Sequence, residues 1–224
     1  AQMAAVVEKS RRHGRANPNA MFQKEESVAD VLAAPVVADP LTRSECCPIA
    51  DGAAAIVIGS AKMARRLGAG VRIDSVVLRS GLYENPMDLA RWKTDQQTCA
   101  LAYDQAGVCP AALLVVECHD AFSLAEILHC EAMGLCAPGE GGPFVESGAT
   151  SLGGRIPVNV SGGLLSRGHP VAATGVAQIV EIAAQLRGSA TGRQVEHARV
   201  GVAQCMGGDL AGDTKSCTVA VLSR

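Results

Sequence analysis

Residues 157–175 read P-V-N-V-S-G-G-L-L-S-R-G-H-P-V-A-A-T-G and decide the fold of this chain. The stretch begins as a short β-branched run, passes through glycines and leads into a segment with helical periodicity. Gly188 is a suitable stop for that helix. Its expected apolar side carries Val176, Ile179, Val180, Ala183 and Leu186, and its expected polar side carries Gln178, Glu181 and Gln185.

His169 is the residue in this stretch that can do chemistry. It stands directly before Pro170, which is well suited to a first helical turn. The surrounding glycines lack side chains, so a ligand can approach the backbone closely. A helix N-terminus disfavours positive charge and keeps an imidazole neutral, as a general base requires. The same histidine can equally serve only to cap or pack the turn, and the stretch alone leaves both interpretations open.

The stretch resembles the thiolase signature N-x-x-G-G-x-x-x-x-G-H-P-x-x-A-T-G. Two earlier segments, R-A-N-P-N-A-M-F at 15–22 and A-D-P-L…C-C-P-I-A-D-G-A-A-A between 38 and 55, resemble thiolases of the sterol-carrier-protein type. The resemblance covers the whole chain but only the second half of a thiolase. It implies a layered α/β fold, with the tail of the N-terminal half at 1–60 and a complete C-terminal domain at 61–224.

Composition supports this fold class and excludes several functions. Hydrophobic residues make up 48% of the 224 residues and aromatic residues only 3%, so small aliphatic side chains must form the core. A net charge of −2 argues against a nucleic-acid partner. Neither a membrane-spanning apolar run nor a signal peptide is visible. The nine cysteines lack C-x-x-C spacing, which indicates a reducing, cytoplasmic location. Cys118-His119 and His129-Cys130 are weak metal-ligand candidates, and we expect no metal site.

Periodicity and turn residues predict alternating strands and helices after residue 70, and hence a partly parallel sheet with helices on both faces. Capping boxes at Thr94/Gln97 and Ser123/Glu126 are expected to open two of the helices. A Gly/Pro-rich loop is expected at 137–154, and a loop containing Pro86 precedes the first boxed helix. Strands are predicted at 53–59 (buried), 71–79, 113–118, 158–160, 200–206 and 217–222, and helices at 1–13, 27–33, 61–68, 94–107, 123–134 and from 170 to 188.

Three reactive side chains follow or end predicted strands, where open α/β sheets collect ligands. They are His119, His169 and Cys205. H-D-A-F at 119–122 resembles the thiolase N-E-A-F motif, and Q-C-M-G-G at 204–208 resembles its C-x-G motif.

The resemblance implies a role for each of these residues. His169 would be the base that activates a nucleophilic cysteine, and Cys205 the acid and base at the α-carbon of an acyl-CoA. His119 would orient a water in the oxyanion hole, and the N–H of Gly207 would line a second such hole. Phe122 and Gly168 would line the substrate site. Coenzyme A is implied as co-substrate, and no bound cofactor is expected.

Three departures from the family pattern stand out. Ala121 occupies the position where the sterol-carrier type has cysteine, so any acid must be Cys205. The run G-G-D-L-A-G-D at 207–213 is more acidic than the usual turn. The nucleophilic cysteine, which belongs to the first half of a thiolase, is not recognisable here. Cys46 and Cys47 lie in a proline-rich segment, and Cys99 lies in a predicted helix.

The expected function is acyl-CoA carbon–carbon bond cleavage or formation together with a complementary N-terminal half, either a separate chain or one lost by truncation. We also expect a homo-oligomer. Two alternatives remain open at this point. One is a thiolase-like aldolase acting on side-chain acyl-CoA with an OB-fold partner, and the other is a non-catalytic thiolase-like subunit.

Overall fold

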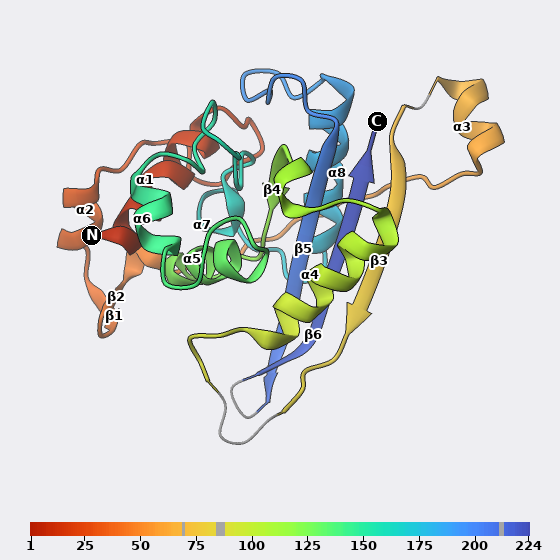
Figure 1. The fold of residues 1–224 in the computed structure, drawn as a ribbon. Coiled ribbons are helices and arrows are strands. Elements are labelled where there is room, and N and C mark those ends of the chain that lie inside the picture. The colour runs from red at the N-terminus through yellow and green to blue at the C-terminus, as the bar shows by residue number, and fades with distance from the viewer. Residues whose placement is uncertain (69, 84–87, 211–212) are drawn as a thin grey trace.

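The structure is a computed structural model that describes residues 1–68, 70–83, 88–210 and 213–224. Figure 1 shows a helical N-terminal part beside a sheet built largely from the C-terminal half of the chain. The helices are α1 (Gln2–Arg15), α2 (Val28–Ala33), α3 (Ala61–Leu67), α4 (Lys93–Ala106), α5 (Ser123–Ala132), α6 (Gly141–Glu146), α7 (Gly163–Arg167) and α8 (Thr174–Arg187). The strands are β1 (Val36–Ala38), β2 (Leu41–Thr42), β3 (Arg72–Arg79), β4 (Val115–Glu117), β5 (Val200–Leu210) and β6 (Asp213–Ser223).

The main sheet has the strand order β3-β6-β5-β4. Strands β3, β6 and β5 are antiparallel, and β4 pairs with β5 in parallel. Side chains of β6 alternate between two cores: Val219 and Val221 belong to the cluster on the α4 side, while Ala220 and Leu222 belong to the cluster on the α8 side. A strand covered on both faces needs such a continuous apolar run. The predicted α/β fold, with a partly parallel sheet between helices, is confirmed.

The predicted strand at 158–160 forms only a single bridge, between Val158 and Val116. Asn159 adopts a left-handed backbone conformation, with φ of 55°, which interrupts the extended run. The strand predicted at 113–118 is likewise shorter, because only Val115–Glu117 pair with β5. At the other end, β5 and β6 continue as a pair through Leu210 and Asp213, so most of the predicted 207–213 turn is strand. Residues 211–212, like Pro86, lie outside the described residues.

The prediction of both capping boxes is wrong, because residues distant in the sequence bind the side chains concerned. The N-cap of α4 is Trp92, and the hydroxyl of Thr94 donates instead to Asp213 at 2.9 Å. The N-cap of α5 is Phe122, and Glu126 is buried in an ion pair with Lys9 of α1. A buried charge pair of this kind is stable only when both partners stay together.

Helix α8 lies with its polar side inward, opposite to the amphipathic pattern predicted from the sequence. Gln178, Glu181 and Gln185 are all buried. Glu181 accepts two hydrogen bonds from the Arg193 guanidinium, at 3.0 and 2.9 Å, so the segment after the helix satisfies its charge. Val180, on the expected apolar side, is 41% exposed. Ile182 and Leu186 nevertheless pack against the sheet as core residues.

Two short helices replace predicted loops or turns. Helix α6 lies within the expected loop 137–154, and α7 begins at Gly163 and ends two residues before His169. As a result α8 begins at Thr174, four residues after Pro170, whose carbonyl accepts from the N–H groups of Ala173 and Thr174. The end of α8 at Gly188 is as predicted.

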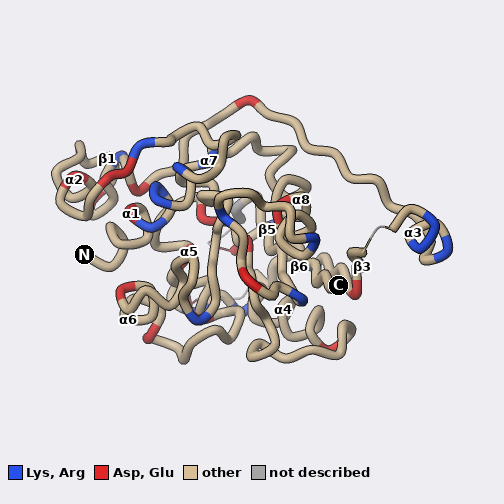
Figure 2. Tube along the Cα trace, turned by 90° about the horizontal axis from the view of Figure 1, so that it is seen from above, with Lys and Arg blue, Asp and Glu red and all other residues tan. Residues whose placement is uncertain are grey.

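The prediction of a buried strand at 53–59 is wrong. Residues 51–60 form no strand and run along the outside of the molecule to α3, which has no buried residue (Figures 1 and 2). Val57 is fully exposed, and Ile58 is 71% exposed. An extended segment forms a strand only beside another one, and the residues around it provide none. Within the described part of the chain, no helix has the length and apolar character needed to cross a bilayer.

Candidate active site

The structure brings the three predicted catalytic residues together at the carboxyl end of β4, beside the middle of β5. His119 follows β4, Cys205 lies in β5, and His169 lies in the segment between α7 and α8. The Sγ atom of Cys205 is 3.4 Å from Nδ1 of His119. The His119 and His169 rings meet edge to face, with centroids 5.0 Å apart and planes at 86°. Residues separated by as many as 86 positions thus form one cluster.

A hydrogen bond to Thr174 defines the tautomer of His169. Its Nδ1 lies 2.8 Å from Oγ1 of Thr174, and that hydroxyl donates its hydrogen to the carbonyl of Pro170 at 3.1 Å. Thr174 therefore accepts from His169, and Nδ1 carries the proton. The lone pair then sits on Nε2. Burial, and secondarily the positive charge of Arg167, lower the pKa of His169, so the imidazole is neutral and basic at Nε2.

His119 and Cys205 have complementary protonation states. Burial lowers the pKa of His119 to about 3, and burial raises the pKa of the Cys205 thiol to about 11. Near neutral pH the thiol is protonated and the imidazole is not, and we assign the contact as Sγ–H donating to Nδ1 of His119. His119 then carries its proton on Nε2. The site thus holds a thiol proton, an imidazole N–H donor on His119 and an imidazole lone pair on His169.

Two motif residues position the segment that carries His169. The carboxylate of Asp120 accepts from the N–H of Leu164 at 2.7 Å and so caps the start of α7. A side chain at Gly163 would collide with that carboxylate, since an added Cβ would lie 2.1 Å from it. Asn159 accepts from the N–H of Cys118 at 2.8 Å and ties the end of β4 to the same segment. The Asn and Gly positions of the motif therefore have structural causes.

The segment 48–50 fixes the backbone of His169 from the other side. The N–H of His169 donates to the carbonyl of Pro48 at 3.0 Å, and Ile49 forms a parallel bridge with His169. Gly168, predicted to line the substrate site, has φ of 99°, and an added Cβ would lie 2.9 Å from Cβ of Ala50. Its visible contribution is this close packing, and its contact with substrate stays a prediction.

Gly207 and Phe122 follow Cys205 and His119 closely in the chain, and each contacts a residue outside the cluster. The N–H of Gly207 points at Oγ1 of Thr214, 3.3 Å away on the paired strand. Phe122 is half-exposed and bridges to Cys46. The oxyanion and substrate roles of these two residues stay predictions.

The cysteines discounted as nucleophiles have raised thiol pKa values. Burial raises the pKa of Cys47 to about 11, and burial raises that of Cys99 well above its ordinary value. Thiols with such pKa values are weak nucleophiles at neutral pH. Cys118 and Cys130, each weighed above as a metal ligand, are fully buried in the core on the α4 side.

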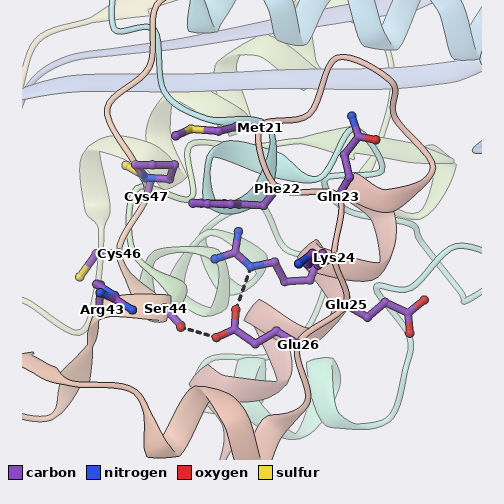
Figure 3. A pocket seen from close by; sticks show the side chains of 12 residues that line it. Met21, Phe22, Gln23, Lys24, Glu25, Glu26, Arg43, Ser44, Cys46 and Cys47 are labelled. Atoms are coloured by element: carbon purple, nitrogen blue, oxygen red, sulfur yellow. Dashed lines mark hydrogen bonds and ion pairs between the residues drawn. The ribbon is translucent and has the colours of Figure 1, made fainter.

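The N-terminal part of the chain contains a cavity of about 880 Å³ (Figure 3). It lies between the segments 21–26 and 43–48, and its wall includes Cys46, Cys47 and Pro48. Arg11 crosses it, stacked 3.9 Å over the Phe22 ring and bonded to Glu26. None of the three clustered residues lines it, so the geometry of the cluster, rather than the size of this cavity, identifies the candidate site.

Sequence reasoning missed four residues around the site. Thr174 was part of the quoted motif, and only the tertiary structure reveals its bond to His169. Asp95, His129 and Gln204 are fully buried and contact the backbone of His119 either directly or through one another. No sequence pattern gave them this role, although Gln204 precedes Cys205 in the C-x-G-like motif and His129 was weighed above as a metal ligand.

Known proteins are similar to this chain in sequence and in fold. Residues 82–224 match the family described as "Thiolase C-terminal domain-like". The chain is 41% identical over 210 residues to the benzoylsuccinyl-CoA thiolase subunit BbsB of Thauera aromatica, covering 92% of this chain and 54% of that protein. It is 40% identical to an acetyl-CoA acetyltransferase of Methanothermobacter thermautotrophicus (92% and 55%) and 35% identical to sterol carrier protein 2 of Oryctolagus cuniculus (91% and 39%).

A solved structure, the Ltp2-ChsH2(DUF35) aldolase, has the same fold, with a TM-score of 0.85 at 23% identity over 98% of this chain and 57% of that chain. The present chain spans about half the length of the first two curated relatives and a smaller part of the third. The motifs, the layered fold and these matches agree: the chain belongs to the thiolase family and carries its C-terminal domain.

Proposed function

We propose that this chain supplies the acid–base half of a thiolase-type acyltransferase that breaks or forms a carbon–carbon bond next to an acyl-CoA thioester. The observation that carries the proposal is the cluster in which Cys205 Sγ lies 3.4 Å from His119 Nδ1 and the His119 and His169 rings touch. A proton donor, a neutral base and an N–H donor at one point match what enolate chemistry at a thioester requires.

Each group has a defined task in the cleavage direction. His169 takes the proton of a nucleophilic cysteine at Nε2, and the resulting thiolate attacks the ketone of a 3-ketoacyl-CoA. The bond between C2 and C3 breaks, and its electron pair forms the enolate of the C1–C2 fragment that carries coenzyme A, while the acyl group that begins at C3 stays on the nucleophilic cysteine. The Cys205 thiol protonates C2, which leaves an acyl thioester on the nucleophile and a thiolate at Cys205. Coenzyme A then takes the acyl group, its thiol proton restores the Cys205 thiol, and the proton held by His169 returns to the nucleophilic cysteine as it leaves. The Nε2–H of His119 stabilises the enolate oxygen, directly or through a water.

A complementary N-terminal half would supply the nucleophile and cover exposed apolar surface. Helix α8 has Val180 exposed on the side away from its buried polar residues. Beside it, the face of β3 opposite to buried Val77 carries Val76 and Leu78, which are 56% and 69% exposed. Exposed apolar faces of this kind mark interaction surfaces. We assign residues 1–60 to the tail of the N-terminal half and 61–224 to the C-terminal domain, with 53–59 pairing as a strand only once that half is present.

Reconstitution tests this function. The chain is co-expressed with the part of the Thauera aromatica relative that it does not match, and CoA-dependent loss of a 3-ketoacyl-CoA is measured. His169→Ala should reduce the rate by about two to four orders of magnitude, the usual contribution of a general base. His197→Asn is the matched control, because His197 is exposed and Asn tolerates its left-handed conformation, with φ of 55°. Near-normal turnover by the His169→Ala complex would contradict the proposal.

An aldolase that cleaves a side-chain acyl-CoA with an OB-fold partner is the second candidate. It is favoured by the shared fold of the aldolase structure and by the weakly nucleophilic state of Cys47 and Cys99. Retro-aldol cleavage needs no nucleophilic cysteine and no coenzyme A as acyl acceptor. Cleavage of a 3-hydroxyacyl-CoA without added coenzyme A, and no thiolysis, would select this candidate.

A further inference from the structure

We propose that Asp95, His129 and Gln204 form a buried clamp that holds the His119 peptide and thereby sets the position of the His119 ring against Cys205. They are positioning residues, since they contact the backbone of His119 and not the cluster itself. The inference rests on the proposed function only where it predicts an effect on turnover.

The first arm of the clamp holds the amide of His119. The N–H of His119 donates to Oε1 of Gln204 at 3.0 Å. The Nε2 of the same side chain donates to Oδ1 of Asp95 at 3.1 Å, which fixes the amide orientation. Gln204 is fully buried and directly precedes Cys205 in β5. Gln204, which holds the His119 amide, is therefore the chain neighbour of Cys205, whose thiol contacts the His119 ring.

The second arm holds the carbonyl of His119. The Nε2 of His129 lies 3.1 Å from that carbonyl, and Nδ1 of His129 lies 2.6 Å from Oδ2 of Asp95. Trp92 meets the His129 ring edge to face at 4.8 Å and restricts its rotation. Both arms therefore end on the two oxygens of a single carboxylate, that of Asp95.

The proton count of the second arm follows from its partners. A carbonyl only accepts, so Nε2 of His129 must carry a hydrogen. The short contact between Nδ1 and the Asp95 carboxylate requires one more hydrogen between those atoms. The His129–Asp95 pair therefore holds two protons and is neutral overall, as a fully buried pair must be. Whichever of the two atoms carries the shared hydrogen, Nε2–H of His129 donates to the His119 carbonyl.

The clamp is important because the proposed chemistry requires the His119 ring to keep one orientation. Its Nδ1 must face Sγ of Cys205 and its Nε2–H must face the reacting oxygen, and a displacement of about 1 Å costs on the order of 100-fold in rate. Both the backbone N–H and the backbone C=O of His119 are bonded to buried side chains. The backbone of His119 therefore cannot rotate independently of β5 and α4. The ring direction is then limited to the rotamers of its own χ angles.

Gln204→Met tests the clamp, because it keeps the side chain length and removes both hydrogen bonds. In the ¹⁵N-labelled 224-residue chain, we expect amide exchange of His119 to accelerate at least tenfold. The imidazole, observed by ¹H–¹⁵N correlation, should lose its single Nε2–H tautomer. In the reconstituted enzyme kcat should fall about 100-fold while KM changes less than threefold.

Two further variants separate positioning from simple destabilisation. Cys217→Ala is the matched control, since the Cys217 thiol contacts Asp95 Oδ1 at 3.5 Å and Gln204 Nε2 at 3.8 Å but makes neither of the hydrogen bonds to the His119 backbone; exchange and tautomer should stay as in the wild type. Gln204→Glu should rescue both, because a carboxylic acid buried beside Asp95 stays protonated and offers the same acceptor and donor. If Gln204→Met does not fold, His129→Phe replaces it, because this variant keeps an aromatic ring and removes both hydrogen bonds of the second arm; the same two His119 signals should change.

The outcomes are distinct. Unchanged His119 exchange and tautomer in Gln204→Met would overturn the clamp. Changed signals with unchanged kcat would overturn its positioning role. Intact clamp signals in a wild-type complex that lacks all thiolysis would support the clamp and contradict the proposed function instead.

Discussion

Nδ1 of His169 lies 2.8 Å from Oγ1 of Thr174, which starts helix α8 five residues later. The hydroxyl donates its one hydrogen bond to the Pro170 carbonyl, and with its hydrogen directed there it accepts from the imidazole. This contact gives the histidine its tautomer and anchors it to a helix, and a side chain on a rigid element keeps its geometry better than one on a free loop.

Thr174→Val should therefore lower kcat of the reconstituted enzyme by about 10- to 100-fold, because it keeps the shape of the residue but removes the acceptor that selects the Nε2 base. Steady-state kinetics of the complex would measure it. Thr174→Ser, which keeps the hydroxyl, should retain most activity. Equal losses in the two variants would mean that the methyl group and its packing, not the hydrogen bond, are what the site needs.

Cys205→Ser should block carbon–carbon bond cleavage while sparing acylation of the nucleophile by an added acyl-CoA. Burial already raises the pKa of the thiol to about 11, and an alcohol is a much weaker acid than a thiol. Intact-mass spectrometry should show an acyl-enzyme that forms without turnover. Cys109→Ser, at an exposed cysteine, should behave as the wild type. Failure to trap any acyl species on the Cys205→Ser complex would count against the assigned role.

Acidification should destabilise the fold through His13. Its Nδ1–H donates to the Asn159 carbonyl and its Nε2 accepts from the Leu152 N–H, each at 3.0 Å, so only the neutral ring fits. Burial, reinforced by the charge of Lys9, lowers its pKa from 6.5 to about 3. Between these values the unfolded chain binds a proton that the folded chain does not. The free energy of unfolding should thus fall by about 1.4 kcal/mol per pH unit as pH drops below 6.5.

His13→Gln isolates that contribution, since an amide offers a donor and an acceptor but does not titrate. Urea unfolding of wild type and variant at pH 7, 6, 5 and 4 should give curves whose difference in stability shrinks as pH falls. Parallel pH dependences would show that His13 is protonated in the folded state without cost.

The chain alone should self-associate through the open face of the sheet beside α8. Leu78→Lys places a charge on that face and should weaken self-association at least about tenfold, since burying a leucine side chain contributes roughly 1.5–3 kcal/mol. Light scattering at several protein concentrations would measure it. Leu32→Lys, at a comparably exposed leucine on α2, is the control. A wild-type chain that stays monomeric, or equal effects of both substitutions, would contradict this interface.

Much of the local structure was predictable because it depends on neighbours in the sequence. The ends of α4 and α8 follow from Gly107 and Gly188, which adopt the left-handed conformation that glycine tolerates best. Strands β5 and β6 follow from continuous apolar runs, which only a sheet covered on both faces can bury. The G-H-P, H-D-A-F and Q-C-M-G-G motifs indicated the thiolase family and named the three residues that the fold brings together.

Tertiary structure decided everything that depends on partners distant in the sequence. Thr94 and Glu126 have the spacing of capping residues, yet Asp213 and Lys9 bind their side chains. The polar side of α8 is the buried one because Arg193 neutralises Glu181. Residues 53–59 have the composition of a buried strand but form none, because a strand exists only with a neighbour to accept its hydrogen bonds. The sequence named His119, and only the fold shows that Gln204, His129 and Asp95 hold its peptide in place.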